Sequence, residues 1–259
     1  MIKNKLFMLS LLLLASGLAN SYEVETHREI SRKAALVSTL SSRLPDFGLI
    51  DLDSSLPSKT HMIGSFGSKV LTCQEDFITP ISVSIIDLIR LGAFCEDVTF
   101  GDSAIDGFRY INHFYDPAHG GRGFSGGTYR SSRVWGLENT DIGGQNFSYR
   151  DARAYFYKGL TLPTKEDRDA NLAKTFRSIG HVIHLIEDLA QPQHTRDDPH
   201  GSGSLYEQYT DKQEVRTNLP FNGYGPVQIT IPDQLWDTND LKGLANFFQH
   251  EFCDGRHQF

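Results

Sequence analysis

The chain has 259 residues, enough for one large domain or two small ones, and 39% of them are hydrophobic, which suffices for a core. Its formal net charge of -7 at pH 7 argues against a broad, non-specific nucleic-acid-binding surface. The charge does not exclude a nuclease whose site holds metal cations, and ten histidines are many for this length.

The N-terminal segment has the pattern of an export signal. Two early lysines precede an apolar run over residues 6–15, which is short for a membrane span. A small-x-small cleavage pattern ends at Ser21, so we expect residues 1–21 to be a signal peptide. The mature chain, residues 22–259, is then expected to be one domain that is secreted or periplasmic. An uncleaved membrane anchor is the alternative.

Two helices are predicted in the first part of the mature chain. Residues 26–44 carry an apolar side at helical spacing, and Thr26 with Glu29 has the pattern of a capping box. Residues 45–67 are rich in Pro, Gly, Ser and Asp, which predicts a loop. A second, apolar helix is predicted over residues 80–93.

The middle of the chain combines an aromatic segment, a loop and a further helix. Residues 108–117 are rich in aromatic side chains, include His113 and end with Asp-Pro. Residues 120–144 are rich in glycine and predict a surface loop. Residues 151–160 have aromatics at helical spacing, and this predicted helix leads into the central one.

The clearest element is a buried helix predicted over residues 166–189, where apolar side chains recur at helical spacing. His184 and Asp188 are four residues apart and therefore share one face. A charged carboxylate in so apolar a helix needs a partner, and zinc suits an imidazole–carboxylate pair. A simple His–Asp hydrogen bond is the alternative. Pro192 ends the helix and directs His194 back toward the same face.

The C-terminal part predicts a helix over residues 204–216, a short strand over 227–231 and an amphipathic helix over 241–252. The chain stops at Phe259 directly after this last helix, so it is either a fragment or lacks a further helix. Together the elements predict a mainly α fold, a helical bundle with long loops and a buried metal site.

The three cysteines, Cys73, Cys95 and Cys253, do not form a zinc-binding pattern. In an oxidising compartment they allow one disulfide and one free thiol. Cys73 and Cys95 are the closer pair in sequence, but the pattern itself leaves the pairing open.

The residues around the central helix match a known family. His184, Asp188 and His194 form H-x3-D-x5-H, and His113 begins a His-Phe-Tyr-Asp-Pro string. With these motifs, nearly all of the mature chain resembles the zinc-dependent phospholipase C / P1 nuclease superfamily, and the second string is similar to its bacterial phospholipase C branch. Signal cleavage would also leave an aromatic residue, Tyr22, first in the mature chain, where the family usually has Trp.

The resemblance implies three zinc ions. Since several cations close together lower the pKa of a bound water, Asp97 is the best candidate to orient or deprotonate that water while it binds metal. The resemblance also implies that Asp188 bridges two of the ions. The implied ligands are the Tyr22 amino and carbonyl groups, His27 and Asp188 for the first ion, Asp97, His113, His184 and Asp188 for the second, and His194, Glu207 and one more histidine for the third.

The third zinc site departs from the family pattern. The family has a histidine four residues before the final glutamate, whereas Gly203 stands at that position before Glu207. The nearest histidine is His200. Either His200 completes the site from its loop, which we favour because three protein ligands plus solvent are usual for catalytic zinc, or the third site is weakened.

The expected function is that of an exported zinc-dependent phosphodiesterase, a hydrolase acting on ester bonds. The resemblance favours a phospholipid substrate at a membrane surface, cleaved in the manner of a phospholipase C by metal-activated water. Two alternatives stay open: a P1-like nuclease acting on single-stranded nucleic acid, and a non-catalytic exported zinc-binding protein.

Four other side chains near the motifs have simpler expected roles. Glu187 is expected to point to a different helix face from Asp188 and to be structural. His181 is expected to lie in the core or to support the ligands from behind. Arg109 and Arg196 either contact phosphate or are only solvated.

Overall fold

The computed structural model describes residues 24–63, 72–75, 80–97, 109–138, 145–200, 204–218, 231–237 and 243–253. These residues form a mainly helical fold with two small antiparallel sheets, as the sequence predicts for its class. Across the described part of the chain, no helix combines the length and the apolar character that crossing a membrane requires.

The helices and strands fall into three sets. The α-helices are α2 Val24–Val37, α3 Leu40–Arg43, α4 Ile85–Asp97, α5 Phe124–Gly127, α6 Ser132–Leu137, α7 Tyr149–Thr161, α8 Lys165–Asp188, α9 Leu205–Thr210, α10 Gln213–Thr217 and α11 Leu244–Cys253. The 3-10 helices are η1 Leu44–Phe47, η2 Arg109–Asn112, η3 Pro117–His119 and η4 Pro232–Leu235. The strands are β1 Ser55–Ser58, β2 Thr60–Ile63, β3 Thr72–Glu75 and β4 Ile81–Ser84.

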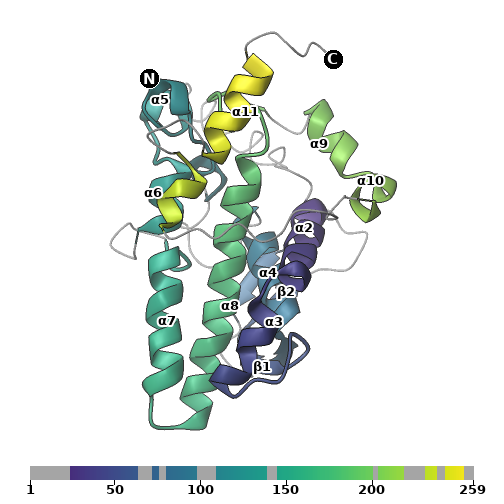
Figure 1. Cartoon of the computed structure of the whole chain (residues 1–259), viewed down its shortest axis with the longest axis vertical. Coiled ribbons are helices and arrows are strands. Elements are labelled where there is room, and N and C mark those ends of the chain that lie inside the picture. The colour runs from purple at the N-terminus through teal and green to yellow at the C-terminus, as the bar shows by residue number, and fades with distance from the viewer. Residues whose placement is uncertain are drawn as a thin grey trace, which may run out of the picture.

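Helix α8 is the central element of the fold. It runs along the long axis of the molecule, with α7 on one side and α4 and α2 on the other (Figure 1). Its start is fixed by Thr164, whose hydroxyl accepts a hydrogen bond from the backbone N–H of Asp167. The acidic Glu166 and Asp167 in the first turn also favour this start, because they complement the helix dipole.

Helices α4 and α8 approach each other closely enough for their backbones to touch. A methyl group added at Gly92 would lie 2.0 Å from the carbonyl oxygen of Arg177, and one added at Gly180 would lie 2.0 Å from that of Ile89. Only glycine fits at these two positions. The crossing brings the C-terminal end of α4 beside the C-terminal half of α8, where His184 and Asp188 lie.

Two apolar clusters fill the interior on either side of the motif. The first packs α2, α4 and α8 together through residues such as Ile85, Leu88 and Phe176. The second packs the C-terminal half of α8 against Trp135 and Trp236. The motif therefore sits between two packed cores, which hold the helices that carry it.

The first helix was predicted over residues 26–44, but the structure divides this range between two helices. Helix α2 already includes Val24 and ends at Val37, and the short α3 follows it. The predicted cap at Thr26 is wrong, because Thr26 lies inside α2 and its hydroxyl donates instead to the carbonyl oxygen of Thr210 at 3.3 Å. A capping box needs its first residue at the helix start, and the helix begins earlier.

The predicted loop over residues 45–67 contains structure that the sequence did not reveal. It includes η1, β1 and β2. Strand β1 pairs antiparallel with β4, and β2 pairs with β3. The helix predicted over residues 80–93 consequently begins only at Ile85, because residues 81–84 form β4.

The later predictions hold in outline. The helices expected over residues 151–160 and 166–189 are α7 and α8. The glycine-rich stretch predicted as loop contains the short α5 and α6, and the helix predicted over 204–216 is divided into α9 and α10. The final helix is α11, and most of the strand predicted over 227–231 lies outside the described residues.

A disulfide joins Cys73 in β3 to Cys95 in α4, with the two Cα atoms 5.6 Å apart. The sequence left this pairing open. The bond attaches the strand to the last turns of α4, two residues before Asp97.

Candidate metal centre

The centre is built on the C-terminal half of α8. His184 and Asp188 lie one turn apart and are fully buried, with His184 Nε2 3.3 Å from Asp188 Oδ2. The other ring nitrogen of His184, Nδ1, donates a hydrogen bond to the carbonyl oxygen of Ala93 in α4 at 2.7 Å. The ring is thereby held with Nε2 toward the carboxylates.

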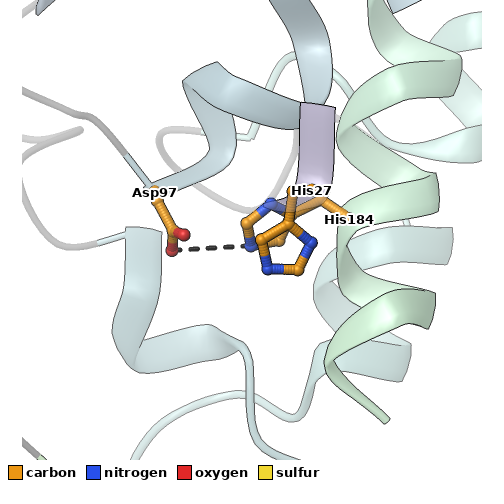
Figure 2. Close-up of side chains that lie close together, drawn as sticks. All are labelled: His27, Asp97 and His184. Atoms are coloured by element: carbon orange, nitrogen blue, oxygen red, sulfur yellow. Dashed lines mark ion pairs between the residues drawn. The ribbon is translucent and has the colours of Figure 1, made fainter. Parts of the chain in front are cut away.

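Helices α4 and α2 add a carboxylate and a second imidazole. Asp97, the last residue of α4, places Oδ1 3.4 Å from His184 Nε2. His27 comes from α2 and stacks on the His184 ring, with centroids 3.7 Å apart. Figure 2 shows the Asp97 carboxylate directed at the two stacked rings, so three helices meet at this point.

Asp188 is the most connected residue of the centre. Its Oδ2 atom lies 2.9 Å from His113 Nδ1 and 3.3 Å from both His184 Nε2 and His194 Nδ1. Its Oδ1 atom lies 3.4 Å from His27 Nε2. Four imidazoles from separate parts of the chain therefore face one carboxylate.

A second group of side chains adjoins the first through His194. His194 Nε2 lies 3.1 Å from His200 Nε2, which in turn lies 3.0 Å from Glu207 Oε1. Gln191 donates a hydrogen bond from Nε2 to the same Glu207 oxygen at 2.5 Å. Glu207 sits in the first turn of α9, whose start is capped by Ser204. The structure thus places His200 beside Glu207.

The donor atoms fit divalent cations. Three groups each bring their ligand atoms within 4.8 Å of one another, and the first two share His184: His27, Asp97 and His184; His113, His184 and Asp188; and His194, His200 and Glu207.

Within the described residues, several buried atoms of these groups have no hydrogen-bond partner: both carboxylate oxygens of Asp97 and of Asp188, both ring nitrogens of His113, Nε2 of His184 and Nδ1 of His194. Unsatisfied buried polar atoms are costly and uncommon. Their convergence on one place is what a cation-binding site requires.

The electrostatics of the protein alone point the same way. Burial by itself would raise the pKa of Asp188, but His194, His184 and His113 lower it well below its usual range. Burial would lower the pKa of His113, but the nearby carboxylates of Asp188, Glu96 and Asp97 raise it to about 9. Protons on the imidazoles therefore balance the carboxylates, and a bound cation would displace them.

The structure brings eight of the nine predicted ligands together: His27, Asp97, His113, His184, Asp188, His194, His200 and Glu207. Tyr22 and Gly203 lie outside the described residues. The grouping differs from the predicted assignment at His27. This residue lies in one group with Asp97 and His184, and it also faces Asp188.

Two glutamates beside the candidate ligands form hydrogen bonds that the sequence pattern did not reveal. Glu187 was expected to be structural, and its Oε2 accepts a hydrogen bond from His27 Nδ1 at 2.6 Å. Glu96, which was not singled out, accepts hydrogen bonds from Arg109 and from His181. Arg109 is consequently buried in an ion pair with Glu96 at 2.6 Å and is not simply solvated.

The two other side chains follow their expectations more closely. His181 is buried, stacks on Phe147 with ring centroids 4.3 Å apart and supports the centre through Glu96. Arg196 is 39% exposed and lies 3.6 Å from Asp198 in an ion pair.

Comparisons with protein-family models, with curated proteins and with solved structures found no match. The geometry of the centre and the motifs that form it are therefore the basis for assigning a function.

Proposed function

We propose that this chain is an exported, zinc-dependent phosphodiesterase that hydrolyses phosphate esters of phospholipids. The observation that carries the proposal is the arrangement around Asp188, where four imidazoles converge on one buried carboxylate next to a separate His–His–Glu group. Adjoining groups of this kind suit several cations held close together, which is typical of enzymes that act on phosphate esters.

The donor chemistry favours zinc. The three groups contain only imidazoles and carboxylates, which suit a borderline cation, and they contain no cysteine. Zinc bound here would polarise the phosphate ester and lower the pKa of water.

Asp97 is the residue we assign to proton handling. Burial would raise the pKa of its carboxyl, but the attraction of His184 and His113 lowers it, so the group stays ionised near neutral pH. Its side chain is only 5% exposed, and neither oxygen hydrogen-bonds to another described residue. An ionised carboxylate whose oxygens are free of such hydrogen bonds can orient a water molecule and accept its proton.

The group formed by His194, His200 and Glu207 supplies three protein side chains for one cation. A zinc ion with three protein ligands keeps a further position open, which is usual where substrate or water must bind. We therefore assign the phosphate of the substrate to the side of the centre that this group occupies.

Export is part of the proposal and has two supports. The N-terminal sequence has the pattern of a cleaved signal peptide. The Cys73–Cys95 disulfide suits an oxidising compartment, since disulfides persist in secreted and periplasmic proteins.

A nuclease is the second candidate, and one feature favours it. Phe114 stacks on His194 with centroids 4.7 Å apart, Phe124 lies 4.7 Å from Phe114, and Tyr129 stacks on Phe124 at 5.8 Å. This aromatic series leads from the centre to Tyr129, which is 42% exposed. Nucleobases stack on such rings, so a single-stranded nucleic acid is the competing substrate.

The test is a direct comparison of substrates. The zinc-loaded mature protein is assayed on phosphatidylcholine vesicles and on single-stranded DNA, beside the variants Asp97→Asn and Asp87→Asn. Asp87 is a half-exposed residue earlier on α4 and serves as the matched control. We expect lipid hydrolysis that falls at least ~100-fold in Asp97→Asn, the usual scale for loss of an acid–base group, and that is unchanged in Asp87→Asn.

Two other outcomes would replace the proposal. Hydrolysis of DNA without hydrolysis of lipid would assign the nuclease activity instead. If neither substrate is cleaved although zinc is bound, the chain is a metal-binding protein without this catalytic function. The zinc content of each variant is measured alongside, so that a lost ion is not mistaken for a lost proton acceptor.

A further inference from the structure

Two Glu-Asp pairs occupy equivalent places at the ends of the two helices that cross. Glu96 and Asp97 end α4, and Glu187 and Asp188 end α8. In each pair the aspartate faces the metal centre. One histidine lies between the two carboxylates of each pair. The aspartate faces one nitrogen of its ring, and the glutamate faces the other nitrogen.

The geometry is clearest at His27. Its Nδ1 lies 2.6 Å from Glu187 Oε2, and its Nε2 lies 3.4 Å from Asp188 Oδ1. Ser31, one turn further along α2, donates a hydrogen bond to the other Glu187 oxygen at 2.9 Å. Since His27 is fully buried and the Glu187 side chain is 8% exposed, the hydrogen bonds are shielded from water.

At His113 the ring nitrogens are exchanged, and the glutamate lies at an ion-pair distance that is longer than a hydrogen bond. His113 Nδ1 lies 3.4 Å from Asp97 Oδ1, and its Nε2 lies 3.6 Å from Glu96 Oε1. Glu96 is fully buried and its orientation is fixed, because it accepts hydrogen bonds from the Arg109 guanidinium and from Trp135 Nε1 at 2.7 Å.

We propose that Glu187 and Glu96 are positioning residues that select which ring nitrogen each histidine presents to a cation. A carboxylate attracts the N–H of a neutral imidazole, which leaves the lone pair on the opposite nitrogen. Glu187 therefore directs Nε2 of His27 to the centre, and Glu96 directs Nδ1 of His113 to it.

Backbone carbonyls do the same for two other histidines. His184 Nδ1 donates to the Ala93 carbonyl at 2.7 Å, and His200 Nδ1 donates to the Asp198 carbonyl at 3.0 Å. Both rings are thereby left with Nε2 for a cation. His113 is then distinguished from His27, His184 and His200 by binding through Nδ1.

The inference rests on the metal-binding part of the proposed function and not on any substrate. Outer partners of this kind typically change metal affinity by ~10–100-fold when they are removed. If no substrate is hydrolysed but the protons lie on the expected ring nitrogens, only the proposed phosphodiesterase activity is contradicted. The two proposals can therefore fail separately.

Nuclear magnetic resonance of the histidine rings tests the assignment directly. The zinc-loaded mature chain is labelled with 15N-histidine, and the ring signals are assigned with the variants His27→Gln and His113→Gln. We expect His27 to carry its proton on Nδ1 and His113 to carry it on Nε2. Either ring with its proton on the opposite nitrogen would overturn the proposal for that pair.

Substitutions at Glu187 test its role. Glu187→Met removes the acceptor, Glu187→Gln retains a carbonyl oxygen that can still accept from His27 Nδ1, and Glu166→Gln on the exposed first turn of α8 is the control. We expect zinc affinity, measured by competition with a chelator, to fall ~10–100-fold in Glu187→Met and to be largely rescued in Glu187→Gln.

Unchanged zinc affinity in Glu187→Met would contradict a positioning role. Circular dichroism of each variant in chelator establishes that it folds. If Glu187→Met does not fold, the ring assignment in the folded Glu187→Gln protein decides, and loss of the Nδ1 proton of His27 there would overturn the proposal.

Discussion

His181 and His184 lie one turn apart on α8 and are both buried, yet their charges are driven in opposite directions. Burial would lower the pKa of His184, but Asp97 and Asp188 raise it well above its usual value. Burial lowers the pKa of His181 to about 3, and its hydrogen bond with Glu96 does not reverse this. Neighbouring charge, and not burial alone, therefore distinguishes the imidazole in the candidate metal centre from the one beside it.

We expect His181 to make the free energy of unfolding depend on pH. Its pKa is about 3 in the folded chain and near 6.5 when unfolded, so unfolding at acidic pH takes up a proton. The stability that neutral His181 contributes is fully present above pH 6.5 and is lost as the pH falls toward 3. We expect a loss of up to about 1.4 kcal/mol per pH unit in this window.

Urea unfolding of the metal-free protein between pH 7 and pH 4.5 measures this contribution. The variant His181→Gln cannot take up the proton, so its free energy of unfolding should fall less steeply with acid than that of the wild type. Equal slopes for the two proteins would contradict the prediction. Chelator is present throughout, because acid also releases metal from histidines.

At the scale of the elements, the crossing of α4 and α8 fixes the centre. The two helices touch at Gly92 and Gly180, and one carries Asp97 while the other carries His184 and Asp188. A small change in their separation would therefore move ligands on one helix relative to those on the other. Packed interiors absorb little added volume, so the spacing is sensitive to a single methyl group.

The variant Gly180→Ala should separate the helices. Its Cβ would lie 2.0 Å from the backbone oxygen of Ile89, a clash that side-chain rotation cannot relieve. We expect a loss of about 2 kcal/mol in the free energy of unfolding, together with weaker zinc binding. Chemical denaturation and a chelator competition measure the two effects. Lys174→Ala, on the exposed face of α8, is the control, and equal behaviour of the two variants would refute the packing argument.

The small sheets show where element prediction stops. Strand β1 pairs with β4, whose residues follow it by more than twenty positions, and the intervening chain contains β2 and β3. Strands of four residues are too short to establish an alternating pattern. Their pairing is decided by contacts between distant segments, so residues 45–67 appeared in sequence only as a loop.

For the whole molecule, the Cys73–Cys95 disulfide links the β2–β3 sheet to the helix that ends in Asp97. It spans a sequence separation of 22 residues. Closing a loop of this size restricts the unfolded chain and typically adds about 3 kcal/mol to stability.

Removal of this disulfide should therefore lower the melting temperature. The variants Cys73→Ser and Cys95→Ser are compared with Cys253→Ser by thermal unfolding with and without reductant, and peptide mapping identifies the bond. We expect reductant to destabilise the wild type and Cys253→Ser, and to leave the other two variants unaffected. A wild type that unfolds at the same temperature in both conditions would contradict a stabilising role.

The sequence by itself determined the central helix, the mainly helical class and the residue types of the candidate metal centre. Apolar spacing along residues 166–189 defined the element that is α8, and the four-residue spacing put His184 and Asp188 on one face. Such local periodicity is a property of the helix itself, so one segment of sequence is sufficient to predict it.

Only the tertiary structure decided how the ligands are grouped and what stands behind them. His27, Asp97 and His113 reach Asp188 or its neighbours from separate elements, and the position of each depends on helix packing. Glu187 looked structural because adjacent helix residues point in different directions. It supports the centre because α2 packs against that second face of α8 and places His27 between the two carboxylates.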